Sequence, residues 1–282
     1  DMILRVNPHF TLWTAKEYNR AHTRVGDYYS EDQSIAGEWI GEAAKSLGLT
    51  GVVTEKDFFA LCEGLNPVTG SRLTQRLNTV RRENGERRSN RRVFHDFTIS
   101  PPKSVSIVAL CEDKRIVELH DRAVRLAMSE LEKFSGTRVR KAGAQGTRST
   151  GNVVAAFFRH ETSRELDPHL HTHCVVFNAT FDAAEGRWKA LQTEGMYRAQ
   201  KFAENLYYHE LSRGLRALGY EIENNARDFE IKGVRRSVIT CFSKRHEQIE
   251  AEVKRQCAQG YDGNIDELRS RVAHERRQRK IK

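Results

Sequence analysis

The chain has 282 residues, of which 38% are hydrophobic and 30% charged, so it can bury a core and is not disordered throughout. It shows no repeat period and no apolar run near the roughly 18 residues of a membrane span, and its five scattered cysteines favour a reducing cytosol over a disulfide framework. A surplus of 47 Lys and Arg over 38 Asp and Glu gives a net charge of +9 and favours a polyanionic partner.

The first part of the sequence alternates helix and strand signals. Thr14 and Thr54 are suited to capping helices, and Gly48 is suited to ending one. The stretch 113–134 has a broad apolar stripe at helical spacing. The elements predicted here are helices over 14–25, 37–47 and 54–62, a strand over 93–99, a helix that begins at Pro102, and a helix over 113–134.

Between these elements lies a strongly basic stretch, residues 72–92. Its arginines are interleaved with Asn, Gln, Ser and Gly and show little apolar periodicity, which predicts a mobile basic loop. We expect such a loop to hold nucleic acid, although a solvated surface without a ligand fits the pattern equally well. The arginines are Arg72, Arg76, Arg81, Arg82, Arg87, Arg88, Arg91 and Arg92.

The second part reads as strands followed by charged helices. The elements predicted are strands over 137–141, 151–160, 170–178 and 188–191, a helix over 193–218, a hairpin with arms 220–222 and 229–231, and charged helices beyond. The polar stretch 161–167 between two apolar strands suits an antiparallel pair. The sequence therefore predicts an α+β fold, with a mostly antiparallel central β-sheet flanked by helices. We expect a catalytic domain over 1–232 and a charged helical extension over 233–282.

Three histidines alternate along one predicted strand: His169, His171 and His173. Strand geometry places them on one face, about 6.6 Å apart for neighbours and about 13 Å for the outer pair. Metal–nitrogen bonds of about 2.0–2.1 Å allow one ion to take two of them, so a third ligand should come from a neighbouring strand. His160 ends the preceding strand and is the natural candidate. Surface histidines without a metal are the alternative.

A three-histidine site leaves coordination positions open, which is typical of a catalytic rather than a structural metal. Neutral imidazoles preserve the charge of the ion, so it can polarise a phosphate or a carbonyl group. The ligand type does not select the metal, and we expect one divalent ion, Mg, Mn, Zn, Ni or Co.

Tyrosines and one acid complete the candidate site. Tyr18, Tyr28 and Tyr29 cluster near the start, but tyrosine has a pKa of about 10 and needs a base or a polarised target to attack phosphorus. Aromatic packing is the alternative for all three. Asp96 lies among strand residues, where burial favours a partner such as histidine or tyrosine. An ordinary edge-strand aspartate fits that segment as well.

With these residues in view, the chain resembles the conjugative relaxases of the MobF class, the TrwC/TraI family of HUH endonucleases. The resemblance runs in order through nearly the whole chain. The stretches that carry it are Glu38–Trp39, Leu47–Gly51, Pro102–Ser106, Thr150–Asn152, His160–Arg164, Asp167–Pro168, Leu170–His173 and Glu204–Asn205. It implies the palm-like fold of HUH relaxases and a protein that continues beyond Lys282, where the family commonly carries a helicase.

The resemblance also implies residue roles. His160, His171 and His173 match the metal ligands, and Asp96 matches the acid that orients the site and helps to deprotonate the nucleophile. Tyr18 stands at the family's first tyrosine pair, beside Glu17 and Asn19, so only one tyrosine of that pair is present. We expect Tyr18 to nick, although Tyr28 is an alternative, and the pair Tyr28 and Tyr29 to serve a later strand transfer. Lys103 is expected to bind DNA together with the arginines.

The activity implied is site- and strand-specific nicking and joining of single-stranded origin-of-transfer DNA in plasmid conjugation. A metal-assisted tyrosine attack would form a 5′-phosphotyrosine link and a free 3′-hydroxyl, so that religation needs no ATP. The implied partners are this DNA, relaxosome accessory proteins and a type IV secretion coupling protein. The implied setting is a monomer in the bacterial cytoplasm, without membrane insertion, that can be translocated with the transferred strand.

Three other functions are compatible with parts of the pattern. A rolling-circle replication initiator carries its tyrosine on a helix after the histidine motif, and Tyr207 and Tyr208 mimic that order. A cupin-like metalloenzyme wants a glutamate four or five residues after the second histidine, and the residues after His173 supply none. A non-catalytic DNA-binding module does not explain the ordered histidines.

Overall fold

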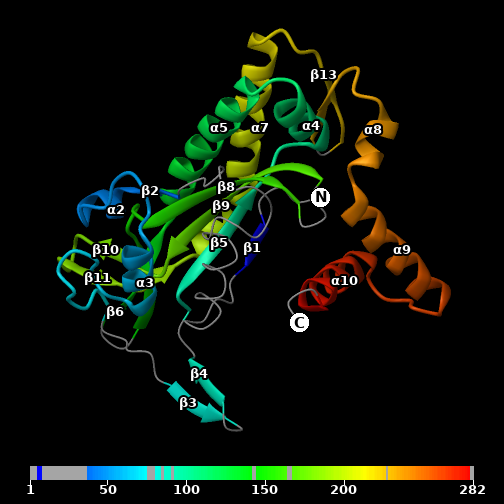
Figure 1. Ribbon diagram of the computed structural model, residues 1–282. Coiled ribbons are helices and arrows are strands. Elements are labelled where there is room, and N and C mark those ends of the chain that lie inside the picture. The colour runs from blue at the N-terminus through cyan, green and yellow to red at the C-terminus, as the bar shows by residue number, and fades with distance from the viewer. Residues whose placement is uncertain are drawn as a thin grey trace.

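The computed structural model describes residues 5–7, 37–74, 80–83, 86–89, 92–141, 144–163, 167–226 and 228–279. Within these residues the chain forms a central five-stranded sheet with helices on both faces (Figure 1). Every neighbouring pair in this sheet is antiparallel, which confirms the predicted α+β fold. In spatial order the strands are β1 (Arg5–Asn7), β5 (Phe94–Ile99), β9 (Pro168–Phe177), β8 (Ala155–Thr162) and β2 (Glu38–Ile40).

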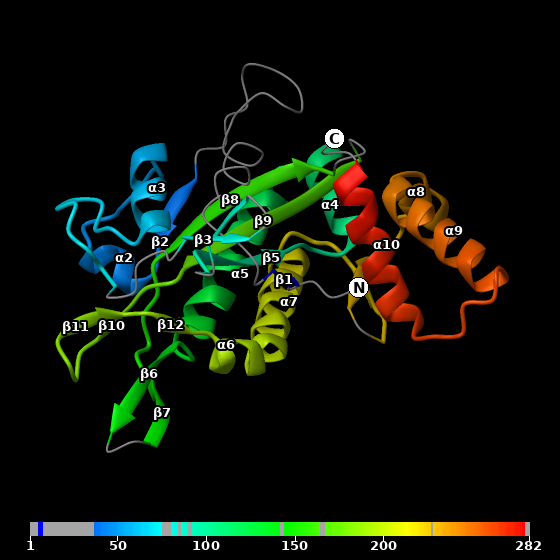
Figure 2. The same ribbon diagram turned by 90° about the horizontal axis from the view of Figure 1, so that it is seen from below.

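Different helices cover the two faces of the sheet, because alternate residues of each strand point to opposite sides. Phe97 and Cys174 face one core, which also contains side chains of α4, α5 and α7. Phe94 and Phe177 face the other core, against α2 and α3. Figure 2 shows α5 and α7 on one side of the sheet and α3 on the other. These helices are α2 (Glu42–Ser46), α3 (Glu55–Glu63), α4 (Lys103–Cys111), α5 (Arg115–Glu132) and α7 (Gln200–Ala217).

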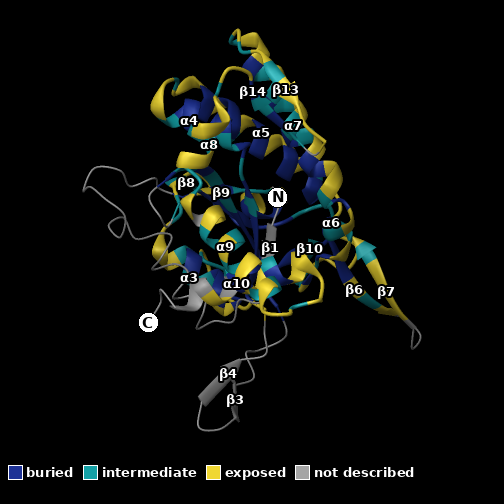
Figure 3. Ribbon diagram, turned by 90° about the vertical axis from the view of Figure 1, so that its right-hand side faces the viewer, coloured by how far each residue is buried: buried dark blue, intermediate teal, exposed yellow. Residues whose placement is uncertain are grey.

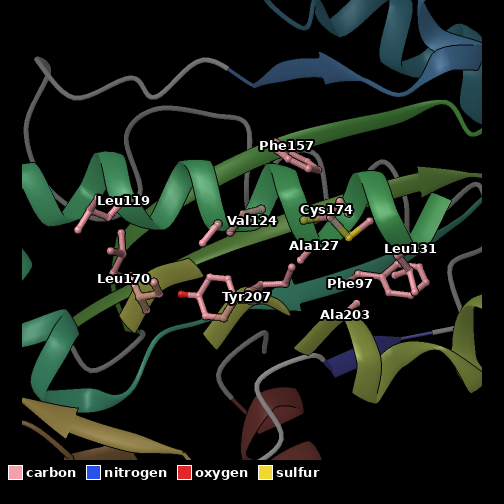
Figure 4. Close-up of a cluster of buried hydrophobic side chains, with 14 of the residues drawn as sticks. Phe97, Leu119, Val124, Ala127, Leu131, Phe157, Leu170, Cys174, Ala203 and Tyr207 are labelled. Carbon is pink, nitrogen blue, oxygen red and sulfur yellow. The ribbon is translucent and has the colours of Figure 1, made fainter. Parts of the chain in front are cut away.

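The larger core lies between the sheet and the helix pair α5 and α7. Leu131 of α5 and Tyr207 of α7 are fully buried there, and Figure 4 shows them with Leu170 and Cys174 of β9. Each large apolar side chain buried in this way contributes about 1.5–3 kcal/mol to folding. Buried residues accordingly follow the sheet and the inner sides of α5 and α7, while α9 and α10 show many exposed residues (Figure 3).

Glu132 joins three elements at the end of α5. Its Oε1 accepts hydrogen bonds of 2.8 Å from the backbone N–H groups of Glu42 and Val153. Glu42 is the first residue of α2, so this carboxylate satisfies one of the amide donors that the start of a helix leaves without an intrahelical partner. The contact ties α5 to α2 and to the chain that enters β8.

Smaller sheets and helices surround this framework. A three-stranded sheet has the order β12, β6, β7, and three hairpins complete the strands. Their bounds are β3 (Val80–Glu83), β4 (Glu86–Ser89), β6 (Gly136–Lys141), β7 (Ala144–Ser149), β10 (Thr180–Asp182), β11 (Arg187–Lys189), β12 (Leu191–Gln192), β13 (Ile222–Asn224) and β14 (Phe229–Ile231). The remaining helices are α6 (Glu194–Arg198), α8 (Arg236–Cys241), α9 (Lys244–Ala258) and α10 (Ile265–Arg279).

The C-terminal helices form a small core of their own. Val253 of α9 packs with Leu268 and Val272 of α10. The backbone N–H of Lys244, at the start of α9, donates to the buried carboxylate of Asp167. This group of helices begins after the last strand, β14. The division into a catalytic region over 1–232 and a charged helical extension of the same domain over 233–282 stays a prediction. Of the described helices, none combines the length and the apolar character that crossing a bilayer requires.

Several predicted elements differ in detail. Residues 38–40 form the edge strand β2, so the helix predicted over 37–47 is shorter and begins only at Glu42. The helix predicted over 193–218 is divided at Ala199. Within 72–92 the prediction of an irregular loop is wrong, because β3 and β4 pair as a hairpin that projects from the body (Figure 1). The helix predicted over 14–25 lies outside the described residues.

Candidate functional site

Three histidines gather on one face of the two longest strands of the central sheet. His160 of β8 is the direct register partner of His171 of β9, and His173 follows two residues later on the same side of β9. The ring centroids of His160, His171 and His173 are 5.2–5.3 Å apart in all three pairs. The structure thus brings His160 beside His171 and His173, while metal binding by these three side chains stays a prediction.

The spacing of the rings fits a shared metal ion. With metal–nitrogen bonds of about 2.0–2.1 Å, and the ring centre about 1 Å beyond the nitrogen, three imidazoles on one ion have centres roughly 4.5–5.3 Å apart. The observed centroid distances of 5.2–5.3 Å lie in this range. Within the described residues, however, no group of three or more His, Cys, Asp or Glu side chains already surrounds a common point. Closing three imidazoles on one ion therefore requires side-chain rotation.

Hydrogen bonds hold one ring nitrogen, Nδ1, of two of these imidazoles. Asp96 of β5 lies 2.8 Å from His173 Nδ1 through its Oδ2, and Thr98 Oγ1 lies 3.2 Å from the same nitrogen. His171 Nδ1 is 2.9 Å from the backbone oxygen of His169. A carboxylate and a carbonyl only accept, so Nδ1 of each ring is the donor in these hydrogen bonds. A carboxylate behind a ligating histidine is a common arrangement in metal sites.

The environment also keeps two of the imidazoles, those of His160 and His171, neutral. Burial, assisted by the neighbouring His173, lowers the pKa of His160 to about 4. Burial and the adjacent imidazoles lower the pKa of His171 well below its usual value. A metal ligand must be unprotonated, so these two side chains are in the binding-competent form at neutral pH. The ring of His169 stacks on His171, with centroids 4.7 Å apart, and belongs to the edge of the group.

The second carboxylate oxygen of Asp96, Oδ1, does not take part in the contact with His173. The residue is 5% exposed, and its Oδ1 is buried without a hydrogen-bond partner among the described residues. Asn7 of β1 lies opposite Asp96 in the register of the sheet. A buried acceptor of this kind is costly unless a donor reaches it.

The predicted tyrosines Tyr18, Tyr28 and Tyr29 lie outside the described residues. The strands on either side of them are described, however. β1 ends at Asn7 at one edge of the central sheet, and β2 begins at Glu38 at the other edge, with the histidine strands between them. The connection 8–36 therefore joins opposite edges of the sheet that carries His160, His171 and His173.

Tyr207 and Tyr208 belong to the opposite side of the sheet. The hydroxyl of Tyr207 is buried and lies 2.7 Å from His120 Nδ1, and burial raises its pKa well above the usual value. Tyr208 packs against the same core, beside Phe229, and burial raises its pKa as well. Neither hydroxyl shares a face with the histidines, which argues against the arrangement of a rolling-circle replication initiator.

The arginines predicted to bind DNA lie on the β3–β4 hairpin and in the chain on either side of it. Arg72 and Arg92 are exposed, whereas Arg76 and Arg91 lie outside the described residues. The backbone register of the hairpin pairs two sets of arginines directly across the strands, Arg81 with Arg88 and Arg82 with Arg87. A DNA contact for any of these arginines stays a prediction.

Lys103 is positioned differently from those arginines. Its Nζ donates a 2.7 Å hydrogen bond to the backbone oxygen of Pro168, the first residue of β9, and burial lowers its pKa. Two serines near the start of α4 also bind neighbouring strands. Ser106 Oγ accepts a hydrogen bond from the backbone N–H of Leu170 in β9, and Ser104 Oγ accepts one from the backbone N–H of Ile231 in β14. A DNA contact for Lys103 stays a prediction, while its observed partner is the strand that carries the histidines.

Sequence reasoning missed one group of polar residues behind the site. His120 of α5 is fully buried and contacts both Tyr207 and Thr172, the residue between His171 and His173. The available signal was a histidine inside the apolar stripe of an amphipathic helix, next to Leu119 and Ala123. A polar side chain at such a position requires a partner across the core.

Comparison with known proteins agrees with this arrangement. The family model for TrwC relaxases matches residues 13–282. The multifunctional conjugation protein TraI of Escherichia coli is 35% identical over 248 residues, which are 81% of this chain and 13% of TraI. TraI of Escherichia coli strain K12 is 35% identical over 252 residues, and the chain spans 14% of its length. The match thus concerns a small part of these relatives.

Solved structures give the same result over most of the chain. A metal-bound complex of the conjugative relaxase TrwC with oriT DNA is 31% identical, has a TM-score of 0.77, and matches over 96% of this chain and 89% of that chain. A metal-free complex of TrwC with oriT DNA is 29% identical, with a TM-score of 0.74 and 98% of both chains covered. From the histidine group, the fold and these likenesses, we conclude that the chain belongs to the TrwC relaxase family.

Proposed function

We propose that this chain is a relaxase that nicks and rejoins single-stranded origin-of-transfer DNA during conjugation. The observation that carries the proposal is the group of three imidazoles on β8 and β9, with Asp96 behind His173, on a sheet whose edges are joined by the tyrosine-bearing stretch. Membership of the TrwC relaxase family supports the same activity. TrwC itself is described in complexes with oriT DNA in metal-bound and metal-free states.

A divalent ion bound by His160, His171 and His173 would supply charge stabilisation to a phosphate in the transition state. The ring spacing supports this ligand set, and imidazole donors leave the choice among Mg, Mn, Zn, Ni and Co open. In the protein, Asp96 keeps His173 oriented through its Oδ2. Asp96 Oδ1 is the acceptor we assign to the proton of the nucleophile.

We assign the nick to Tyr18, with Tyr28 as the alternative, and a later strand transfer to the pair Tyr28 and Tyr29. The tyrosine oxygen forms a bond to the phosphorus, and the bond from phosphorus to the 3′ oxygen breaks. The phenolic proton passes to a base such as Asp96, and the departing 3′ oxygen takes a proton back from that acid. The products are a 5′-phosphotyrosine ester and a DNA strand with a free 3′-hydroxyl. The ester retains the energy of the original bond, so rejoining needs no ATP.

We further propose that the β3–β4 hairpin and its flanking arginines hold the DNA. Its two directly opposed arginine pairs, and the net charge of +9 for the chain, support a polyanionic ligand. Single-stranded DNA is the expected form, because the nucleophile must reach an accessible phosphate. We also propose that the protein is a monomer in the bacterial cytoplasm. Its proposed protein partners are relaxosome accessory proteins and a type IV secretion coupling protein.

Covalent capture of DNA tests the activity. Single-stranded oligonucleotides that tile the origin of transfer of the parent element, labelled at the 3′ end, are incubated with the protein and Mn²⁺ and separated on a denaturing gel. We expect a slowly migrating labelled band for the wild type, its loss in Tyr18→Phe, and its retention in Tyr208→Phe. Capture that survives in Tyr18→Phe, Tyr28→Phe and Tyr29→Phe but fails in Tyr207→Phe or Tyr208→Phe would show the tyrosine assignment to be wrong.

A further inference from the structure

A polar layer lies directly behind the histidine group, on the side of the sheet that faces α5. Thr172 of β9 and Arg159 of β8 are register partners, and both belong to this side. Two consecutive residues of α5 contact them: His120 Nε2 lies 2.9 Å from Thr172 Oγ1, and Asp121 pairs with Arg159. One turn of helix therefore holds both histidine-bearing strands at the same level.

His120 is the buried centre of this layer. It is 0% exposed, and its second ring nitrogen, Nδ1, lies 2.7 Å from the hydroxyl of Tyr207, which is 0% exposed as well. A neutral imidazole has one donor and one acceptor nitrogen, and both are used here. The chain of hydrogen bonds from Tyr207 through His120 to Thr172 thus connects α7, α5 and β9. Satisfied buried networks of this kind rigidify the structure around them.

The pleat of the strands makes this layer relevant to the site. Thr172 points toward α5, so its two neighbours on β9, His171 and His173, point to the opposite face. Arg159 likewise precedes His160 on β8. Each of the three histidines is therefore one residue away from a side chain that α5 holds. The ligands of a metal site must be held within about 0.5 Å of their productive positions, and an anchored neighbouring residue limits their movement on this scale.

We propose that His120 and Asp121, with Tyr207, form a rear brace that positions His160, His171 and His173 for metal binding. This inference rests on the proposed metal-dependent function. It assigns to α5 a positioning role, since none of the brace residues reaches the face on which DNA and metal would bind. Apolar side chains of similar size would fill the same volume but would not fix the angle at which β9 presents its two imidazoles.

Variants that delete one hydroxyl each test the brace with matched controls. Thr172→Val and Tyr207→Phe remove the two ends of the hydrogen-bond chain without changing side-chain size appreciably. Thr137→Val removes a buried hydroxyl that bonds to Ala190 O in another sheet, and Tyr208→Phe removes the neighbouring hydroxyl on α7. Binding of Mn²⁺ to the 282-residue chain is measured by calorimetry, and the visible spectrum of the Co²⁺-loaded protein reports ligand geometry.

We expect Thr172→Val and Tyr207→Phe to weaken Mn²⁺ binding about tenfold and to shift the Co²⁺ bands, as outer partners of metal ligands do. Thr137→Val and Tyr208→Phe should keep wild-type affinity and spectrum even where thermal stability falls by a similar amount. If the wild type binds metal and the brace variants match the controls in both readouts, the brace is refuted while the proposed function stands. If the wild type binds no metal, both are refuted.

Discussion

His160 and His171 lie directly opposite each other on β8 and β9, with ring centroids 5.2 Å apart and ring planes only 24° from parallel. Two half-buried imidazoles in this position would repel each other if both carried a proton. Burial lowers the pKa of both, so they stay neutral at physiological pH. The sheet register therefore supplies a pair of neutral nitrogen donors before any ion is bound.

Replacing Asp96 tests its hold on His173. In Asp96→Asn we expect Mn²⁺ affinity, measured by calorimetry, to fall by about 10–100-fold, because the charged acceptor that orients the His173 ring is removed. Asp182→Asn is the matched control, since Asp182 is a buried carboxylate paired with Arg148 and Lys189 instead. Equal metal affinity in the two variants would contradict the assigned role of Asp96.

Acid should lower the free energy of unfolding of the metal-free protein, because His120 is buried in its neutral form. Burial, followed by the charges of Arg159 and His169, lowers the pKa of His120 to about 3, below the roughly 6.5 of an unfolded histidine. The unfolded chain then binds the extra proton, so the free energy of unfolding falls as pH drops from about 6.5 toward 3, by at most ~1.4 kcal/mol per pH unit from this group.

Urea unfolding at pH 7, 6 and 5 measures that slope. His120→Gln should show a shallower loss of stability over this range than the wild type. His209→Gln, which changes an exposed histidine on α7, should keep the wild-type slope. An unchanged slope in His120→Gln would mean that His120 is not the buried neutral group.

The arginine hairpin should govern the salt dependence of DNA binding. In Arg81→Gln/Arg88→Gln, one directly opposed pair is removed. We expect the slope of log affinity for single-stranded DNA against log salt to decrease by about 0.7 for each phosphate that the variant no longer neutralises. Without DNA the variant should be slightly more stable, by about 0.2–1 kcal/mol, because a like-charge pair is gone. Arg216→Gln changes an exposed arginine on α7 and should alter neither the salt dependence nor the stability. Fluorescence anisotropy measures DNA affinity at each salt concentration, and urea titration measures the free energy of unfolding.

Glu132 offers a test of the framework rather than of the site. Glu132→Ala leaves the amides of Glu42 and Val153 without their acceptor, and we expect a loss of about 1–3 kcal/mol in the free energy of unfolding. Glu132→Gln keeps an oxygen atom that can accept the same two hydrogen bonds. The amide carries no charge, which suits this site because burial raises the pKa of the native Glu132 carboxyl. It should retain most of the stability in a thermal melt, and equal loss in both variants would argue against the hydrogen bonds as the cause.

The sequence predicts those features that a local pattern determines. The alternation of His169, His171 and His173 places them on one strand face, and Thr54 accepts from Asp57 N as the predicted cap of α3. The pairing of His160 with β9 also follows, because only a short polar stretch separates the two strands. These inferences need only strand period, helix capping and loop length.

Other features depend on pairing between distant segments. Residues 38–40 read as helix, yet they pair with Ala155–Phe157 across more than a hundred residues and form the edge of the sheet. The hairpin within 72–92 pairs charged residues that have no apolar alternation. The hydrogen bond between His120 and Thr172 joins a helix to a strand through the core, which no local pattern encodes.

The anchoring of β1 and β2 at opposite margins of the sheet has a mechanical consequence. A DNA strand esterified to a tyrosine between them would pull on a bridge fixed at both ends, not on a loose terminus. Tension on that strand would be shared between the hydrogen bonds of β1 to β5 and those of β2 to β8. The load would therefore fall on both edges of the sheet whose middle strands, β8 and β9, carry the imidazoles.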